Sequence, residues 1–490
     1  MVKQVKLYYI IHMKKRIFTL TIIFFMVFSF VYAGGTSEQS SAYINNIPNM
    51  IQTSSTSNSQ DEISRDMNTL ERLYRYLDAH YLYDIDEDKA YEAMATALFD
   101  SLDEDYTYYV SSSDKADYVE DTSGVYAGIG VYFSKILPEY SDPENPDTFL
   151  CNITQVFPET PSSRAGIKAG DMITAINGES VNDLTPTECA NIMKGDPGTD
   201  VTLTLRRANN SFDIKLIREI ITVPTVENTI INEKTGYLRI LQFTQSTTQA
   251  AFDSLLELKN DNITSLIIDL RDNGGGDIDV ALNIADMFIS DKKLLTIKYK
   301  DPEDDITYQA NSQTLIDTDI PVVILVNGGT ASSSEILTGA LKDDNRATVI
   351  GNTTYGKGIM QLVAPFDKGY VSITTANFLP PGGEVIHKKG IEPDITVEVP
   401  VIDDEHFQSY SDLVNSGDIK KWVDEHPENT SENIDSFVLS NQDSSLSDEI
   451  LKILIRAEYN YRQSDDNRII ADVEYDNVLK RAVTFINTGK

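Results

Sequence analysis

Apolar residues in the first part of the chain recur with the spacing of a helix. Between residues 61 and 102 they fall at intervals of three or four, which places them on one face of an amphipathic helix. Two sets of residues predict two helices: Leu70, Leu73, Tyr74, Leu77 and Tyr81, then Tyr91, Met94, Ala95, Leu98 and Leu102. We interpret both apolar faces as surfaces that pack against other helices or another subunit.

From about residue 123 the pattern changes to short apolar segments interrupted by Gly and Pro. Alternation of this kind is typical of strands, and the pattern predicts a small strand-rich domain that ends near Ile217. The expected elements are strands within 124–133, 148–157 and 201–205 and short helices at 162–167 and 186–193.

Residues 235–400 alternate between buried strands and amphipathic helices, which implies an α/β core with helices packed on its sheet. The expected strands are 237–243, 266–270, 322–326 and 348–350. Two helices between them are marked by Phe252, Leu255 and Leu256, then by Val280, Ile284, Met287 and Phe288. The remaining residues, 401–490, are polar and acidic, with helical stretches at 448–461 and 475–486 and no recognisable chemistry.

The N-terminus has the pattern of a secretory signal. A basic cluster at 13–16 precedes an apolar run of 16 residues and the small residues 33–35. A membrane-spanning helix needs about 20 apolar residues, so a cleaved signal is favoured over a retained anchor. We expect Met13 to be the true start, cleavage near Ala33, and export to the periplasm or cell envelope. Residues 34–60, rich in Ser, Asn, Gln and Thr, read as a flexible linker.

The net charge narrows the choice of partners, whereas the two cysteines leave their own state open. The chain carries 76 Asp and Glu against 41 Lys and Arg, a formal charge of -35, which disfavours nucleic acid and anionic membranes as partners. The two cysteines, Cys151 and Cys189, are either a disulfide or two buried small hydrophobic residues, and their spacing leaves both open.

Two motifs that suggest a nucleotide or a metal are incomplete. Residues 351–357 match the GxxxxGK start of a phosphate-binding loop, but Gly358 stands where Ser or Thr would hold magnesium. Residues 84–88 resemble the opening of a calcium loop, but Lys89 replaces the required Gly and Ala95 the required Glu. We therefore expect no nucleotide, no metal and no cofactor.

A serine cluster follows the strand at 322–326 and precedes a predicted helix. Residues 332–334 are all serine, and a hydroxyl at a helix N-terminus lies where free N–H groups and the helix dipole stabilise an oxyanion. Simple N-capping by Ser is the alternative. His387 is the one histidine in the α/β region and no GxSxG motif is present, so a base other than histidine is needed.

A lysine that could act as this base lies in a glycine-flanked segment. Lys357 stands between Gly356 and Gly358, followed by apolar residues and Gln361. A lysine accepts a proton only when neutral, and lowering its pKa from about 10.4 to near 7 costs about 4–5 kcal/mol. An uncharged Gln could hold the amine without raising its pKa, which suits a Ser-Lys dyad.

The segments around these residues resemble those of the carboxyl-terminal processing peptidases, which join a PDZ domain to a Ser-Lys core. The resemblance covers about 95–400. Residues 330–335 resemble the family's Ser-Ala-Ser-Ala-Ser-Glu segment, which implies Ser332 as nucleophile. Residues 355–358 resemble its Phe-Gly-Lys-Gly segment, which implies Lys357 as base and Gln361 as the residue that orients it.

Three further positions follow from the same resemblance. The turn at 271–276 resembles Leu-Arg-x-Asn-Pro-Gly-Gly, with Gly274 in place of Pro, which implies the N–H groups of Gly275 and Ser333 as oxyanion donors. On its own this glycine-rich segment is also explained as a tight turn. Asp343 matches an auxiliary Asp of the family, and we interpret it as structural.

The strand-rich domain resembles a PDZ domain. Gly128, Ile129, Gly130 and Val131 correspond to the loop and strand that grip a terminal carboxylate and pair with the peptide, and the helix at 186–193 to the other wall of the groove. Segments 162–171 and 176–178 also match.

The resemblance implies a multidomain α/β protein with a ClpP/crotonase-like catalytic core, an inserted PDZ domain and helical N- and C-terminal regions. The expected parts are a signal at 1–33, a linker at 34–60, a helical region at 61–120, the PDZ domain at 121–217, the peptidase core at 218–400 and a helical acidic region at 401–490.

The implied function is an exported serine endopeptidase that captures polypeptides by a free C-terminus and cleaves near it. A homodimer or a partner-regulated assembly is also expected. The alternatives are a non-catalytic tail-binding adaptor with a decayed core, and a crotonase-like acyl-CoA enzyme; neither needs an intact Ser-Lys pair.

Overall fold

The computed structural model describes most of the chain beyond the N-terminal segment. The described residues are 57–102, 104–111, 124–138, 141, 143–208, 210–367, 369–400, 402, 406–463 and 468–489. The expected signal, 1–33, and most of the expected linker lie outside them. Within these ranges, none of the helices combines the length and the apolar character needed to span a bilayer.

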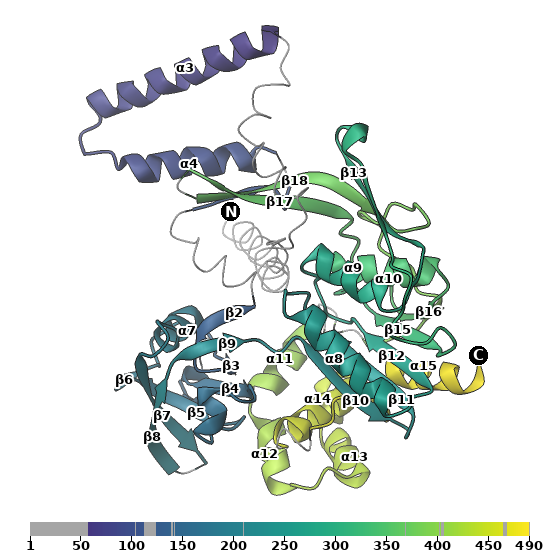
Figure 1. Ribbon diagram of the computed structural model, residues 1–490. Coiled ribbons are helices and arrows are strands. Elements are labelled where there is room, and N and C mark those ends of the chain that lie inside the picture. Colours follow the sequence, from purple (N-terminus) through teal and green to yellow (C-terminus); the bar gives the residue numbers. More distant parts are fainter. Residues whose placement is uncertain are drawn as a thin grey trace.

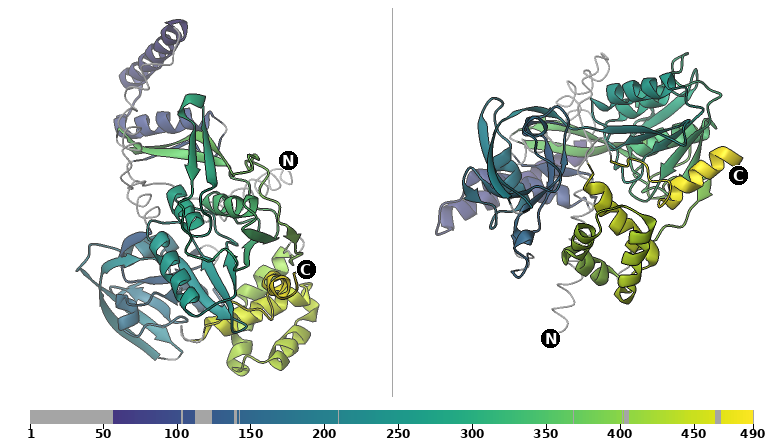
Figure 2. Two further views of the ribbon diagram at one scale, coloured as in Figure 1. Left: turned by 45° about the vertical axis from the view of Figure 1, so that its right-hand side comes forward. Right: turned by 90° about the horizontal axis from the view of Figure 1, so that it is seen from below.

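Two helices at the N-terminal end form an arm on the molecule. They are α3 (Ser57–His80) and α4 (Glu87–Asp100), the latter capped by Asp86. α3 begins four residues inside the expected linker, because its first turn is built of Ser, Asn and Gln and carries no apolar signal. α3 extends away from the rest of the structure, while α4 lies beside a sheet (Figures 1 and 2).

The strand-rich domain contains one sheet of six strands, a two-stranded ladder and two helices. The sheet consists of β3 (Val131–Ser134), β4 (Cys151–Val156), β5 (Met172–Ile176), β6 (Glu179–Ser180), β7 (Asp200–Arg207) and β8 (Asn210–Ile217). The helices are α6 (Pro161–Arg164) and α7 (Pro186–Met193), and β2 (Val125–Gly128) pairs with β9 (Glu219–Thr222) at the junction with the core. Its own apolar cluster includes both cysteines, which are free and buried.

A six-stranded sheet forms the centre of the α/β core. Its order is β10 (Val226–Ile231), β11 (Thr235–Ile240), β12 (Ser265–Asp269), β15 (Val322–Val326), β16 (Ala347–Gly351) and β19 (Ile395–Thr396). β10 is antiparallel to β11, and the remaining pairs are parallel. Parallel strands have both faces covered, which explains why every residue of β12 and β15 is buried.

Different helices cover the two faces of this sheet. α8 (Thr247–Asn260), α9 (Ile278–Asp286) and α10 (Ser333–Asp343) pack on one face and share its apolar cluster. On the other face, α15 (Asn477–Thr488) packs against Ile267, Val323 and Leu325. The last helix of the expected acidic region is therefore part of the core.

A second, twisted sheet extends from the core toward the N-terminal arm (Figure 1). It contains β1 (Tyr108–Val110), β18 (Gly369–Leu379), β13 (Lys293–Tyr299) and β14 (Ile306–Gln309), with β17 (Ile359–Phe366) also paired to β18. The sequence prediction missed this sheet. Ser372, Thr374, Thr375 and Asn377 interrupt the apolar residues of β18, so the apolar alternation is weak until the partner strand is known.

Four more helices form a bundle between the core and the strand-rich domain. They are α11 (Phe407–Asn415), α12 (Asp418–Glu425), α13 (Ser431–Ser440) and α14 (Asp448–Tyr461), and they enclose their own apolar cluster. At the end of α14 the Tyr461 hydroxyl accepts from Gly170 N at 2.7 Å and bonds Asn152 of the strand-rich domain. The bundle thus connects the two larger parts (Figure 1).

Candidate active site

Ser332 lies between β15 and α10 in a strained backbone conformation. It is the N-cap residue of α10, with φ 55° and ψ -118°, a region that non-glycine residues rarely occupy. Its side chain is fully buried. Strain of this kind persists only where the surroundings enforce it, and it is concentrated at functional sites.

The three adjacent serines have different hydrogen bonds. Ser333 Oγ donates to Gly276 O at 2.7 Å and Ser334 Oγ donates to Asn273 O at 2.9 Å. Ser332 Oγ is buried and has no hydrogen-bond partner within the described part of the chain. Two of the hydroxyls therefore attach α10 to the turn at 271–276, here called the glycine turn. Of the three, only the Ser332 hydroxyl has no hydrogen bond to a described residue and is available to react.

The glycine turn is in direct contact with Ser332. Gly275 has φ 104°, and a Cβ at this position would lie 2.8 Å from Ser332 Cβ and 2.9 Å from Ser333 N. The structure thus brings together Gly275, Ser332 and Ser333. In this arrangement Gly275 N donates to Asn273 Oδ1 at 2.9 Å.

Glu335 links the backbones of the two predicted catalytic residues, a role that the sequence reasoning missed. Its Oε2 accepts from Ser332 N at 2.9 Å and from Lys357 N at 2.8 Å. Its Oε1 accepts from Gly356 N at 2.8 Å and from the Thr354 hydroxyl. Burial raises the pKa of this carboxyl, while the hydrogen bonds act in the opposite direction. An acidic residue in the first turn of a predicted helix also fits ordinary capping, so the sequence offered no separate signal for this role.

Lys357 is buried in the segment that leads into β17. Only 6% of the residue is exposed, and burial lowers the pKa of its amine from 10.5 to about 8, although the carboxylates of Glu104 and Glu335 act to raise it. Gly356 and Gly358 allow the turn at 386–390 to pack closely against this segment. Since Ser332 Oγ has no partner, the amine does not bond to it in this arrangement.

Gln361 lies near the same site but bonds elsewhere. Its Nε2 donates to Thr374 Oγ1 at 3.2 Å, and Thr374 Oγ1 donates to Glu104 Oε2 at 3.1 Å. Its buried Oε1 has no partner among the described residues, so the expected contact with the lysine amine is not formed here.

Two further positions considered from the sequence are Asp343 and His387, of which only Asp343 lies apart from this centre. Asp343, at the last position of α10, is exposed and accepts from Gly382 N at 2.6 Å. It is eleven residues beyond Ser332, roughly 16 Å along the helix axis, which agrees with a structural role. His387 is half-buried in the turn that packs on Gly358, and burial lowers its pKa.

The expected peptide-binding residues run from the end of β2 to the start of β3. Ile129, Gly130 and Val131 are buried. Phe157 N donates to Gly130 O at 3.0 Å and Ser162 N to Ile129 O at 3.1 Å, so these carbonyls are already used within the domain.

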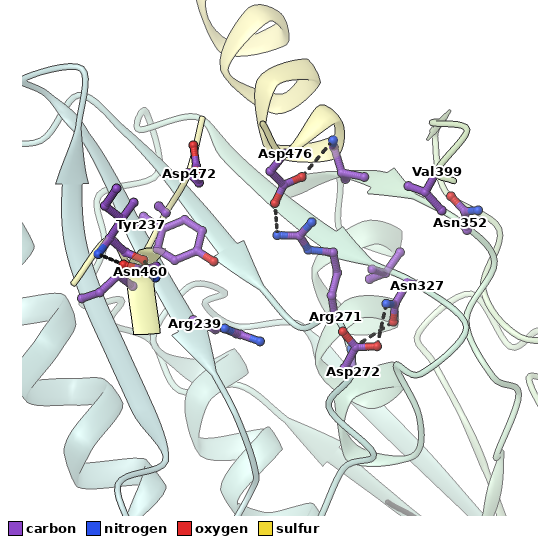
Figure 3. Close-up of a pocket in the computed structure, with 15 residues that line it drawn as sticks. Tyr237, Arg239, Arg271, Asp272, Asn327, Asn352, Val399, Asn460, Asp472 and Asp476 are labelled. Carbon is purple, nitrogen blue, oxygen red and sulfur yellow. Dashed lines mark hydrogen bonds and ion pairs between the residues drawn. The ribbon is translucent and has the colours of Figure 1, made fainter. Parts of the chain in front are cut away.

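A separate cavity of about 460 Å³ lies at the carboxyl ends of β11, β12 and β15, beneath the C-terminal segment (Figure 3). Arg271 borders it and forms ion pairs with Asp269 and with Asp476 at 2.6 Å, and Tyr237 donates to Asp269 at 2.7 Å. None of the predicted site residues lines this cavity, so we do not assign it to catalysis. No cluster of three or more metal-binding side chains occurs in the ranges that the structure describes.

A buried serine hydroxyl at a helix N-terminus, a glycine turn against it and a desolvated lysine are the parts of a serine-type hydrolase site. Comparison with known proteins agrees with this class. The family model for peptidase family S41 matches residues 234–397, and the model for a PDZ domain matches residues 153–207.

Two relatives carry the comparison over most of the chain. The "Probable CtpA-like serine protease" of Staphylococcus aureus strain COL is 33% identical over 361 residues, 73% of this chain and 69% of that protein. The "Carboxy-terminal-processing protease" of Bartonella bacilliformis is 31% identical over 373 residues, 74% of this chain and 82% of that protein. The solved photosystem II D1 C-terminal processing protease is 28% identical, with a TM-score of 0.40, and covers 66% of this chain and 86% of its own.

The chain therefore belongs to peptidase family S41, among the carboxy-terminal-processing proteases, and is a serine-type peptidase with a PDZ domain. The resemblance drawn from its sequence motifs is confirmed at this level.

Proposed function

We propose that the protein cleaves polypeptides near their C-termini with Ser332 as nucleophile and Lys357 as general base. The observation that carries the proposal is the division of roles in the serine cluster: Ser333 and Ser334 bond to the glycine turn, while the Ser332 hydroxyl is unpartnered. The low pKa of Lys357, about 8, supports its role because about a tenth of the amine is then neutral at pH 7, far more than for a lysine with its usual pKa.

Each step moves one proton. Neutral Lys357 takes the proton of Ser332 Oγ while this oxygen bonds to the scissile carbonyl carbon. The ammonium then protonates the leaving amine as the C–N bond breaks, which leaves an ester on Ser332. Water attacks the ester, Lys357 accepts the water's proton, and that proton returns to Ser332 Oγ as the product carboxyl group leaves.

The site must close before this chemistry begins. The amine has to approach Ser332 Oγ, and Gly275 N has to exchange Asn273 Oδ1 for the substrate oxyanion. Catalytic hydrogen bonds are often long or absent without substrate and tighten when it binds. The N–H groups of Gly275 and Ser333 then hold the oxyanion, with Gln361 orienting the amine through its free Oε1.

The PDZ domain selects the substrate in this proposal. The residues Gly128, Ile129, Gly130 and Val131 bind a free C-terminus, with the peptide added as a strand beside α7. The limits of 121–217 for this domain and 218–400 for a ClpP/crotonase-like core are part of the proposal. So is export, with a signal at 1–33 and a destination in the periplasm or cell envelope; N-terminal sequencing of the secreted protein tests it.

A second copy of the chain is the proposed partner of α3. The apolar face predicted from sequence is exposed: Leu70 by 40%, Leu73 by 54%, Leu77 by 48% and Tyr81 by 58%. This helix extends from the body, so two copies can align these faces without a clash of their cores (Figure 2). Sedimentation of the Leu73→Asp variant is expected to show a monomer where the parent chain shows a dimer.

The catalytic proposal is tested by turnover of an unfolded polypeptide. Ser332→Ala and Lys357→Ala are each expected to abolish cleavage, while binding of a C-terminal peptide to the PDZ domain is retained. Full activity in either variant would exclude the dyad. An inactive parent protein that still binds the peptide would instead favour the adaptor, which nothing in the family comparison supports.

A further inference from the structure

The segment between α4 and β1 lies against the proposed base. Lys357 Nζ is 4.5 Å from the centroid of the Tyr106 ring, over its face. Tyr106 comes from a part of the chain about 250 residues away and was not considered in the sequence reasoning. We propose that Tyr106 is a positioning residue: its ring holds the Lys357 ammonium in the resting enzyme, and the neutral amine leaves the ring to reach Ser332.

The backbone that carries this ring is attached to the second sheet. Tyr106 O accepts from Ser372 Oγ at 2.9 Å, and Thr107 Oγ1 accepts from Thr374 N at 3.0 Å. The strand that follows, β1, pairs with β18 through Tyr108 and the next two residues. Because the sheet fixes this backbone, the segment stays in place when the amine moves.

An aromatic face distinguishes the two protonation states of a lysine. The quadrupole of the ring attracts an ammonium, whereas a neutral amine gains little from it. Glu104 adds to this preference, since its carboxylate also favours the charged amine. Deprotonation therefore weakens the hold on the amine at the same time as it creates the base that Ser332 requires.

Two side-chain oxygens of the site that lack hydrogen-bond partners agree with this resting arrangement. Ser332 Oγ and Gln361 Oε1 are both buried without a partner in the described part of the chain, and both would bond a neutral amine that swings away from the ring. A single movement of the Lys357 side chain thus satisfies two buried polar atoms. An unpaired buried polar atom destabilises the folded chain, so the movement is favourable once the charge is gone.

Other titratable groups act on the same amine or contact the groups beside it. Glu104 and Tyr106 come from the segment before β1, Glu335 from α10, and Tyr355, whose hydroxyl accepts from Tyr106 at 3.3 Å, from the loop before β17. On the 386–390 turn, the pKa of His387 is lowered by burial, while the Glu104 carboxylate acts to raise it. The test must therefore separate the ring from these neighbours.

The inference rests on the proposed dyad and is tested by the pH profile of kcat/KM for a peptide substrate. Tyr106→Leu removes the ring face, so the ammonium is less stable and the acidic limb is expected to move down by roughly 0.5–1.5 pH units. On that limb the rate at a fixed pH rises roughly 3- to 30-fold. Tyr106→Phe keeps the ring and loses only the bond to Tyr355, so it is expected to keep the parent profile.

The outcomes distinguish the two proposals. A Tyr106→Leu profile equal to that of the parent protein, with Lys357→Ala inactive, overturns the positioning role and leaves the dyad intact. Full activity of Lys357→Ala overturns the dyad itself. If Tyr106→Leu does not fold, crystal structures of the parent protein at about pH 6 and pH 9.5 decide: the amine is expected over the ring in the first and on Ser332 in the second. An amine over the ring at both pH values would refute the inference.

Discussion

Replacing Lys357 with methionine is expected to inactivate the enzyme and yet to stabilise its fold. The pKa of the amine falls from 10.5 to about 8 because the side chain is buried. A difference of 2.5 units, at 1.36 kcal/mol each, corresponds to a cost of about 3 kcal/mol for keeping this lysine in the folded protein at pH 7. Methionine fills a similar volume without a charge, so most of this cost is removed.

The size of this stabilisation depends on pH. Below pH 8 the amine is protonated in both the folded and unfolded states, and the full cost is present. Between pH 8 and 10.5 the unfolded state binds the proton and the folded state does not, so the stability of the parent protein rises with pH. The advantage of Lys357→Met is therefore greatest below pH 8 and disappears near pH 10.5.

The assay is the thermal unfolding midpoint of both proteins between pH 6.5 and 10. For a domain of 150–250 residues, about 3 kcal/mol corresponds to a rise of roughly 6–12 °C. Attraction of the ammonium to the Tyr106 ring would reduce this gain. Lys421→Met, at an exposed lysine of α12, is the control and is expected to change little. A Lys357→Met variant that is less stable than the parent protein at pH 7, or whose gain does not vary with pH, would refute the reasoning.

Three further substitutions test the geometry of the site and of the core. Gly275→Ala is expected to abolish cleavage, since its Cβ would meet Ser332 Cβ at 2.8 Å. The control is Gly328→Ala, whose Cβ would have no atom within 4 Å. An active Gly275→Ala variant would contradict the close contact. Glu335→Gln replaces one of the two accepting oxygens with an NH2 group, which then faces two hydrogen-bond donors, so kcat is expected to fall at least about 100-fold with KM little changed. An unchanged kcat would argue against the linking role of Glu335. Asp476→Ala removes the N-cap of α15 and one of the two carboxylate partners of Arg271, with an expected loss of roughly 1–3 kcal/mol in chemical denaturation. Asp476→Asn retains a capping side chain and should recover part of this loss; equal losses would assign the effect to the charge alone.

Local patterns in the sequence predicted the regular elements well where apolar spacing is strong. The helix at 186–193 and the strand at 322–326 have the predicted limits, and α14 spans the predicted 448–461. The hairpin of β17 and β18 was missed, because its residues are mixed in polarity and gain their order from pairing across the sheet. The role of α15 was missed for a related reason: an apolar helix face does not say which surface it covers.

The sequence by itself determined the family and the short segments that carry the serine, the lysine and the glycine turn, because each of these is a local pattern of residue types. Only the tertiary structure decided which hydroxyl among three neighbours is left unpaired, since the other two are used by carbonyls about 60 residues away. It also brought Tyr106 and Glu104 to the lysine and joined the backbones of Ser332 and Lys357 to Glu335. Burial and partnership are properties of the packed chain, and they set the pKa of an amine and the freedom of a hydroxyl in ways that residue spacing does not reveal.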